Sequence, residues 1–382
     1  MRGRLQKKNG NWYVVLELKD EKGKRSQKWL SPCKELNITR PKSKREEKKI
    51  AEGFLVDKLQ EVQHGTYFEP TTDSVSEYLD TWYKTYCEPN LRYSTLRLYE
   101  IQIRLHIKPA LGDIPLAQLR PGHIQQLLAE KARTLSENTV KLIYVITKRA
   151  LGHAVQWEYA PRNVCDAVIA PRVESPEVDC WTREEAKEFL EKVKQYRYYS
   201  LCLLALTTGM RRGELLGLRW ADVDIDRQQV TIRQTRIGDE NGGRYEKTKT
   251  KAGERTIDIS AAVAAQLRKH KAEQSAEFLK STSPKADEGL VFTSKRCKPY
   301  APNSLSLSFD RVVELTGMRR ITFHGMRHTH ATMLIEDGVN IKAVAERMGH
   351  SGITVTLGTY AHVLPRIAKD IATKTDHLFS AE

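Results

Sequence analysis

The hydrophobic pattern of this chain changes near residue 70, and that change most constrains what the chain can fold into. The earlier part contains two runs of strand-forming residues, from Trp12 to Leu18 and from Arg25 to Leu30, with a polar turn between them. The later part begins with apolar residues at 75, 78, 79 and 82, which is the spacing of one face of a helix. Because the two periods do not suit one common element, we expect separately folded segments.

Four segments follow from these patterns, and 382 residues are enough for two or three domains. Residues 1–65 are expected to form a small β-sheet plus one helix that follows Pro41. Residues 73–160 are expected to form a bundle of four helices, and residues 161–177, which contain three prolines, a linker. Residues 178–382 are expected to form a mixed, mainly α domain with a small β-hairpin sheet.

Capping signals place several helix ends. Pro121 suits the first position of a helix, and Ser136 or Asn138 suits the cap of the next helix. Thr182 and Glu185 have the spacing of a capping box. Four later glycines are expected to break helices, namely Gly317, Gly338, Gly349 and Gly358.

Positive charge is concentrated at the beginning of the chain. The net charge is +15, and residues 1–50 hold 16 Lys/Arg against 6 Asp/Glu, so 16 − 6 = 10 of the excess charges lie there. Such a basic region attracts the phosphate backbone of nucleic acid, and a small sheet can lie in a DNA groove. The alternative interpretation is a sheet whose lysines are only solvated.

Other features argue against several classes of protein. No two of the six cysteines are spaced as Cys-x-x-Cys, so neither a zinc site nor a redox pair is indicated. The chain has no run of 18 apolar residues that would predict a membrane span, and no apolar stretch follows the basic N-terminus as in a secretory signal. We therefore expect a protein of a reducing cytoplasm.

Polar residues that could carry chemistry are clustered at four places in the last segment. These places are Thr208–Glu214, Lys247–Lys251, His324–Arg327, and the pair Gly349-His350 followed by Tyr360. Each motif alone has a bland interpretation, as a surface H-x-x-R, a solvated lysine or a packed aromatic. Their order and spacing together favour a site.

The chemistry that these residues favour is the binding and attack of a phosphodiester. His324 and Arg327 are three residues apart, so on a helix they face the same way. Arg211 lies at an expected helix start, where free N–H groups also favour an anion. Two arginines can fork onto the non-bridging oxygens of one phosphate. Tyr360 offers a phenol nucleophile, but a pKa of about 10 requires a base or a strong positive field.

The series of motifs resembles that of the tyrosine recombinases, and within them the phage and conjugative-transposon integrases. Arg211 stands in a T-G-x-R-x-x-E box, and an H-x-x-R motif, a Gly-His turn and a T-Y-x-H run follow in the family's order. The gap from Arg327 to His350 is 350 − 327 = 23 residues, and from His350 to Tyr360 it is 360 − 350 = 10 residues, both of which suit the family. The family's hairpin lysine is best matched by Lys249.

Two details of this match differ or stay open. Lys247 and Lys251 are close rivals of Lys249. Asp258 stands where many relatives carry proline at the end of the hairpin.

The resemblance covers nearly the whole chain and implies a function for each segment. Segment 1–65 resembles an arm-type DNA-binding domain, 73–160 a SAM-like, helical core-binding domain, and 178–382 a catalytic domain. The implied reaction is site-specific recombination, the integration and excision of a mobile element, through a 3′-phosphotyrosyl intermediate. Because one phosphodiester is exchanged for another, neither ATP nor a metal is implied as a cofactor.

The resemblance also implies a role for each candidate residue. Arg211 and Arg327 clamp the scissile phosphate, and Tyr360 attacks it. His324 helps to position the phosphate and accepts the tyrosine proton. The remaining implied roles are these: Lys249 protonates the 5′-oxygen leaving group, His350 hydrogen-bonds the phosphate, and Glu214 holds the first arginine box together. His328, His330 and His362 are equally well interpreted as structural.

The implied partners are DNA and further copies of the chain. The family pattern implies double-stranded attachment sites with core and arm sequences, and a homo-tetramer on DNA in the nucleoid of a prokaryotic cell. Apolar residues at helical spacing within 363–382 predict a closing helix, which the family pattern favours as one donated to a neighbouring subunit. The sequence leaves open the DNA target, the need for an excisionase or a host DNA-bending protein, and the choice between a phage and a conjugative transposon.

Three other functions compete with recombination. A type IB topoisomerase shares the tyrosine–arginine chemistry but would not need a separate basic sheet. A non-catalytic DNA-binding regulator would lack at least one site residue, and every expected one is present. A metal-dependent nuclease or transposase would need clustered carboxylates, which the motifs do not contain.

Overall fold

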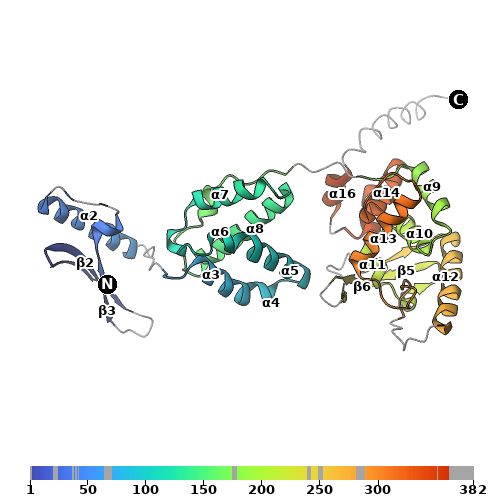
Figure 1. Cartoon of the computed structure of the whole chain (residues 1–382), viewed down its shortest axis with the longest axis horizontal. Coiled ribbons are helices and arrows are strands. Elements are labelled where there is room, and N and C mark those ends of the chain that lie inside the picture. Colours follow the sequence, from blue (N-terminus) through green and yellow to red (C-terminus); the bar gives the residue numbers. More distant parts are fainter. Residues whose placement is uncertain are drawn as a thin grey trace, which may run out of the picture. The chain divides into compact units, whose positions relative to one another are not determined.

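The computed structural model describes residues 2–19, 25–36, 38, 41, 43–63, 71–173, 179–238, 242–247, 253–280, 289–350 and 352–360 (Figure 1). The chain divides into two compact units, Met1–Glu174 and Ser175–Glu382. Within the described part of the chain, every helix is too short or too polar to span a bilayer.

The first unit begins with a three-stranded antiparallel sheet of order β1-β2-β3. Its strands are β1 (Arg2–Lys8), β2 (Asn11–Lys19) and β3 (Arg25–Leu30). The expected sheet is therefore present, with β1 as a strand that the sequence did not suggest. Asn9 and Gly10 join β1 to β2 with positive φ values of 50° and 82°, as a tight two-residue hairpin turn requires.

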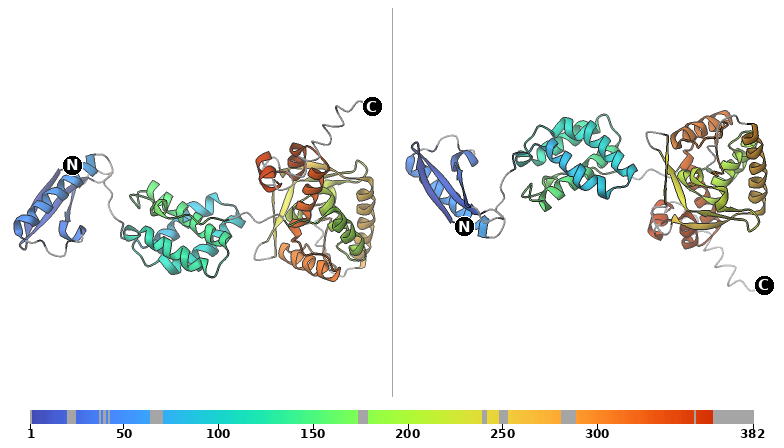
Figure 2. Two further views of the ribbon diagram at one scale, coloured as in Figure 1. Left: turned by 90° about the horizontal axis from the view of Figure 1, so that it is seen from above. Right: turned by 90° about the horizontal axis from the view of Figure 1, so that it is seen from below.

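One face of this sheet is covered by a helix. The short α1 (Pro32–Glu35) precedes α2 (Lys44–Gln63), which contacts β1 and β2 and crosses the sheet in Figure 2. Val14, Leu16 and Phe54 form the buried core between the two layers. Burial of these apolar groups is what fixes the sheet face against the helix.

The rest of the first unit is helical, as expected. Helix α3 (Val75–Trp82) continues through π-helical η1 (Tyr83–Cys87) into α4 (Glu88–Asn90). Helix α5 (Tyr93–Gln102) continues in the same way through π-helical η2 (Ile103–Ile107) into α6 (Lys108–Leu111). The 3-10 turn η3 (Leu116–Gln118), α7 (Pro121–Ala132) and α8 (Glu137–Gln156) follow. Pro121 is the first residue of α7, and Ser136 caps α8. Inside the bundle, the Tyr78 hydroxyl donates to the Ala150 carbonyl over 2.6 Å.

Part of the expected linker packs on this bundle. Residues Val164–Ala167 form 3-10 turn η4, and Cys165 is fully buried. Asn163 fixes the turn, because its side-chain amide donates to the Lys148 carbonyl over 2.9 Å. Residues 161–173 therefore do not act only as a linker, because part of this segment packs against the helical bundle.

The second unit is mainly helical with two small antiparallel sheets, as the sequence predicted. Its helices are α9 (Arg183–Val193), α10 (Tyr199–Thr208), α11 (Arg212–Gly217), 3-10 turn η5 (Trp220–Asp222), α12 (Ala261–Lys280), α13 (Pro302–Leu315), α14 (Phe323–Glu336), α15 (Ile341–Met348) and α16 (Ile353–Tyr360). Strands β4 (Val223–Asp224), β5 (Gln229–Ile232) and β8 (Arg255–Asp258) form one sheet, and β6 (Gln234–Ile237) and β7 (Arg244–Lys247) the other.

Local signals in this unit are confirmed with one exception. Thr182 and Glu185 form the expected capping box at α9. Gly317, Gly338 and Gly349 adopt positive φ and follow helices. The predicted break at Gly358 is wrong, because α16 continues through it. An exposed glycine inside a helix costs only about 0.5–1 kcal/mol relative to alanine, which packing of the rest of α16 can offset.

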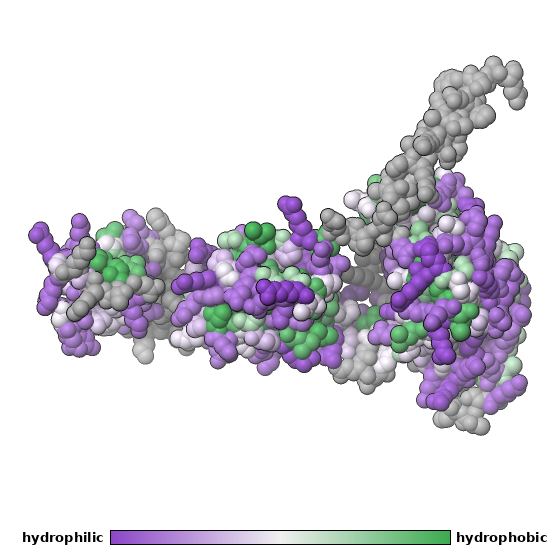
Figure 3. Space-filling model, turned by 45° about the horizontal axis from the view of Figure 1, so that its top comes forward, coloured by the Kyte–Doolittle hydropathy of each residue, from purple (hydrophilic) through white to green (hydrophobic). Residues whose placement is uncertain are grey.

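The second unit has one large core around α10. Leu204 and Leu206 of α10 pack there with Phe189, Leu267 and Phe309 from surrounding helices. A smaller core lies between α14, α15 and α16, and its members are Ala331, Ile335, Val344, Met348 and Tyr360. Outside these cores, hydrophilic side chains cover most of the face drawn in Figure 3.

Candidate functional site

The turn between α10 and α11 holds the first candidate residue, Arg211. Gly209 ends α10 with φ of 65°, a left-handed conformation that suits glycine. A Cβ there would lie 2.6 Å from the His330 ring, so close packing also requires glycine. Arg211 then caps α11, and its backbone N–H donates to Glu214 over 2.9 Å.

Glu214 is buried and shared by two arginines. Its carboxylate accepts from Nη1 of Arg211 over 2.8 Å, and from Nη1 and Nη2 of Arg255 over 3.2 and 3.0 Å. Burial raises the pKa of Glu214, but Arg255 and Arg211 outweigh burial and lower it overall. The carboxylate therefore stays ionised and fixes both guanidinium groups. This geometry agrees with the holding role implied for Glu214.

Arg327 is the most enclosed cation among the residues singled out from the sequence. It is 3% exposed on α14, and it donates to the Gly209 carbonyl over 2.6 Å and to the Met348 carbonyl over 2.5 Å. Burial and then the neighbouring charge of Arg211 lower the pKa of Arg327 to about 9, so it remains a cation at neutral pH. None of the described hydrogen bonds of Arg327 goes to a carboxylate, so its positive charge is available to an anion.

The two arginines meet at one turn. Arg211 donates from Nη2 to the Gly349 carbonyl over 3.0 Å, next to the Met348 carbonyl that Arg327 uses. Gly349 has φ of 64° and ends α15, which directs both carbonyls toward the arginines. The motifs around 211, 327 and 349 are thus brought together, although they are far apart in sequence.

Two candidate histidines lie beside the two arginines. His350 follows the shared turn, and its Nδ1 lies 2.7 Å from Oγ1 of the buried Thr356. Desolvation and then Arg327 lower the pKa of His350 to about 4. Desolvation of its ring, then His328 and Arg327, lower the pKa of His324 to about 4 although the residue keeps some exposure to solvent. Both rings are therefore neutral at pH 7 in the free chain, because desolvation and then the nearby positive groups disfavour their protonated forms.

Tyr360 ends α16 with its side chain buried, at 2% exposure. Its hydroxyl oxygen lies 2.8 Å from Nδ1 of His328, within hydrogen-bond distance. Burial raises the pKa of Tyr360 above its ordinary value, and Arg327 acts in the opposite direction. The described phenol is therefore protonated and lies against His328, for which the sequence analysis left a structural interpretation equally good.

The hairpin lysine cannot be placed in the same way. Lys249 and its rival Lys251 lie outside the described residues, whereas Lys247 is exposed at the end of β7. The segment that carries these lysines joins β7 to β8, and β8 begins with Arg255.

Sequence reasoning missed two residues of this site. Arg255 begins a short β-strand, and only its closeness to the expected hairpin lysine could have drawn attention to it. His328 is four residues after His324, so it lies on the same face of α14, and this spacing was the available signal.

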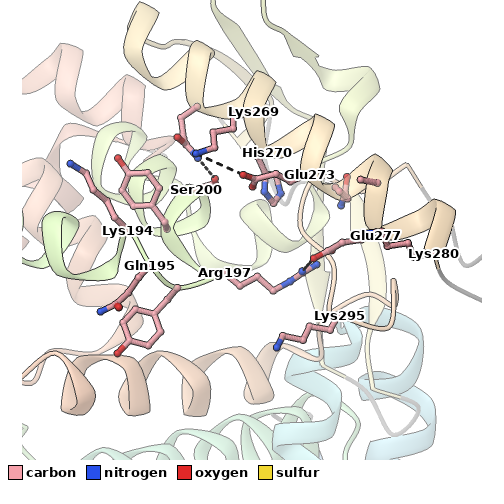
Figure 4. Close-up of a pocket in the computed structure, with 15 residues that line it drawn as sticks. Lys194, Gln195, Arg197, Ser200, Lys269, His270, Glu273, Glu277, Lys280 and Lys295 are labelled. Atoms are coloured by element: carbon pink, nitrogen blue, oxygen red, sulfur yellow. Dashed lines mark hydrogen bonds and ion pairs between the residues drawn. The ribbon is translucent and has the colours of Figure 1, made fainter.

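A separate cavity of about 800 Å³ lies between the start of α10 and α12 (Figure 4). Arg197 and Glu277 form an ion pair in its wall, and Gln266 donates to the Ser200 hydroxyl over 3.0 Å. Among the described residues that line it, none belongs to the motifs described above. The described residues also contain no group of three or more His, Cys, Asp or Glu that could hold a metal ion.

Comparison with known proteins defines the class of enzyme. The model of the phage integrase family matches residues 180–366, and that of the phage integrase N-terminal SAM-like domain matches residues 74–132. The tyrosine recombinase XerC-like protein of Caldanaerobacter subterraneus subsp. tengcongensis is 30% identical over 355 residues, which cover 87% of this chain and 90% of the relative. The ICEBs1 integrase of Bacillus subtilis is 26% identical over 64% of this chain and 67% of its own length.

Solved structures show the same fold. The Tn1549 transposon integrase in complex with transposon right end DNA matches with a TM-score of 0.67 at 23% identity, over 81% of this chain and all of that one. A lambda integrase dimer bound to a COC′ core site matches with a TM-score of 0.60 at 20% identity, over 93% of each chain. The fold and the relatives together define a tyrosine recombinase, an enzyme of site-specific DNA recombination. Within that class, the chain belongs to the phage integrase family.

Proposed function

We propose that this recombinase cuts and rejoins DNA through a 3′-phosphotyrosyl bond to Tyr360, and so integrates and excises a mobile element. The observation that carries the proposal is the meeting of Arg211 and Arg327 at one turn, with Arg327 buried and without a carboxylate among its described partners. Such a pair suits the two non-bridging oxygens of a phosphodiester. It stabilises most where negative charge grows, in the pentacoordinate transition state.

The other site residues take supporting roles in this proposal. His350, anchored on Thr356, donates to a phosphate oxygen, and His324 helps to position the phosphate. Lys249 protonates the 5′-oxygen as it leaves, with Lys247 and Lys251 as alternatives. The freed 5′-hydroxyl, or that of a partner strand, then attacks the phosphotyrosine. The exchange conserves phosphodiester bonds and needs neither ATP nor a metal.

The proposal divides the chain into three working parts. Residues 1–65 bind arm-type DNA sites, residues 73–160 bind core sites, and residues 178–382 catalyse, with 161–177 as the connecting segment. The N-terminal part is supported by its exposed Lys7 and Lys8, which lie 5.9 and 5.3 Å from the ring centres of Trp12 and Trp29.

We also propose that four copies act together on DNA, with residues 363–382 donated between neighbours and an excisionase or host DNA-bending protein setting direction. Lambda integrase has been solved as a tetramer bound to a Holliday junction, which supports this assembly. The donated segment lies outside the described residues.

A plasmid that carries two attachment sites tests the exchange of strands. We expect wild-type protein to yield recombinant circles, visible as new restriction fragments, and Arg327→Ala to yield none. A wild type that only relaxes the supercoils of the plasmid would instead indicate topoisomerase-like action. Binding without cleavage would indicate a DNA-binding regulator.

A further inference from the structure

His328 lies next to the hydroxyl of Tyr360, and the sequence analysis gave this histidine no catalytic role. It follows Arg327 on α14 and lies half-buried, with Nδ1 2.8 Å from the Tyr360 hydroxyl. The two rings are tilted by 59° with their centres 5.7 Å apart. The described contact of the phenol is therefore a directed hydrogen bond to an imidazole nitrogen.

The 2.8 Å contact fits a bond in which the Tyr360 hydroxyl donates to His328. Burial raises the pKa of Tyr360, so the phenol keeps its proton. When the ring hydrogen is on Nε2, Nδ1 of His328 presents a lone pair that accepts this hydrogen bond. A neutral imidazole in this tautomer is a competent proton acceptor.

His324 lies one helical turn away from this contact. Its ring meets the His328 ring edge-on, with centres 4.6 Å apart and an interplanar angle of 89°. The resemblance implies that His324 takes the tyrosine proton, yet the hydroxyl bonds to His328. The edge-on contact places His324 to fix the orientation of the His328 ring.

We propose that His328 is the general base that removes the proton of Tyr360 during strand cleavage. The inference rests on the proposed function, in which Tyr360 is the nucleophile. The O–H bond of Tyr360 breaks and its proton passes to Nδ1 of His328, while the phenolic oxygen forms a bond to phosphorus. The P–O5′ bond breaks, and the 5′-oxygen takes its proton from the acid assigned to the hairpin lysine. Religation reverses these steps, and His328 returns its proton to Tyr360.

This assignment explains how a buried phenol can react. A phenol held at low exposure resists ionisation, and a base in contact avoids a free phenolate. The proton moves within an existing hydrogen bond. The accepted proton returns to Tyr360 along the same hydrogen bond when the phosphotyrosine is attacked.

The test measures single-turnover formation of the covalent adduct on a nicked duplex that carries the attachment core site. Wild type and His328→Gln are each made with natural Tyr360 and with Tyr360 replaced by a fluorinated tyrosine whose phenol ionises more readily. With natural tyrosine, we expect His328→Gln to slow adduct formation by about 100-fold or more. With the fluorinated tyrosine, we expect this ratio to shrink at least about tenfold, because ionisation no longer depends on a base.

A matched control separates this effect from a structural one. His330→Gln changes a buried histidine on the same helix that bonds to the Leu206 carbonyl, away from Tyr360. Any slowing that it causes should be equal for the two tyrosines. DNA binding by all variants is measured in parallel, so that rates are compared at saturation.

Three results would overturn the inference. A defect of His328→Gln that is equal with both tyrosines would assign it a structural role. Faster cleavage in His328→Gln would mean that the histidine only restrains the resting tyrosine. If wild-type protein formed no adduct while it bound the core site, the proposed function itself would fail, and the inference with it.

Discussion

Among single residues, Glu214 fixes the position of the Arg211 side chain. A buried carboxylate with one arginine would be a simple pair, but Arg255 adds a second bidentate partner and also donates from Nε to the Arg347 carbonyl over 2.7 Å. Arg211 stays 40% exposed at its side chain, whereas Arg255 is 8% exposed. Arg255 therefore serves as the internal partner of Glu214, while the side chain of Arg211 stays accessible to the phosphate in the proposed reaction.

Glu214→Gln should destabilise the second unit and abolish adduct formation. Removing one partner from a buried ion pair leaves the two arginines uncompensated, which costs about 3–5 kcal/mol. Hydrogen exchange of α11 and α14 peptides under increasing urea measures the free energy of opening. The control Glu191→Gln removes an exposed pair with Lys194 and should cost less than about 1 kcal/mol. Equal effects of the two substitutions would contradict the role given to Glu214.

The lowered pKa of His330 predicts that the free energy of unfolding of the second unit depends on pH. Burial, then Arg347, lower its pKa from 6.5 to about 4 in the folded chain. The unfolded chain therefore binds this proton first, so the stability contribution is complete above pH 6.5 and is lost as the pH falls through 4. We expect α14 to lose on the order of 2–3 kcal/mol of opening free energy over this range.

His330→Gln should reduce this loss, because glutamine does not titrate there. The measurement is urea-dependent hydrogen exchange of α14 peptides at several pH values, corrected for intrinsic exchange rates. Identical pH slopes for wild type and His330→Gln would show that other groups cause the acid sensitivity.

Among the elements, two glycines should respond in opposite ways to alanine. Gly209 has φ of 65°, and an added Cβ would also lie 2.7 Å from the Met348 sulfur. Gly358 lies inside α16, and an added Cβ would meet nothing within 4 Å. We expect Gly209→Ala to destabilise the second unit and impair cleavage, and Gly358→Ala to stabilise α16 by about 0.5–1 kcal/mol. Thermal unfolding of both variants checks the signs, and destabilisation by Gly358→Ala would contradict the helix at this position.

The elements that the sequence predicted are those with a strong local signal. The strands β5 and β8 are rich in β-branched residues, and the start of α9 has a complete capping box. Strand β1 was missed because Arg2–Lys8 lacks apolar alternation, and its pairing with β2 decides its conformation. The Asn9-Gly10 turn was the available signal for this hairpin.

The candidate site divides in the same way. The order of the motifs predicts Arg211, Arg327 and Tyr360 as site residues, but spacing along a chain does not determine which groups are in contact. The bond from Tyr360 to His328 and the pairing of Arg255 with Glu214 arise from packing between α14 and α16, and between β8 and α11. Such long-range contacts leave no periodic trace in the sequence.

On the scale of the whole molecule, the excess of positive charge in residues 1–50 predicts that binding to arm-site DNA weakens as the salt concentration rises. Each lysine that neutralises a phosphate contributes about 0.9 to the slope of log affinity against log salt concentration. Replacing Lys7 and Lys8 together by glutamine should lower that slope by about 2 on arm-site DNA, while cleavage of the core site stays unchanged. Binding titrations at several salt concentrations check this.

The control for this charge prediction is Lys187→Gln with Lys192→Gln, two exposed lysines on α9. It should leave the slope for arm-site DNA as in wild type. A control slope that falls as much as that of the Lys7 and Lys8 variant would mean that net charge alone, and not the N-terminal sheet, sets the affinity.

The proposed reaction depends on a covalent bond between Tyr360 and DNA, and mass spectrometry can detect this bond. Wild type and Tyr360→Phe are incubated with a nicked duplex that carries the attachment core site, denatured, digested with protease, and searched by mass spectrometry for a nucleotide-linked peptide. We expect an adduct on the α16 peptide at Tyr360 with wild type and none with Tyr360→Phe. An adduct that persists in Tyr360→Phe, or that maps to another residue, would contradict it.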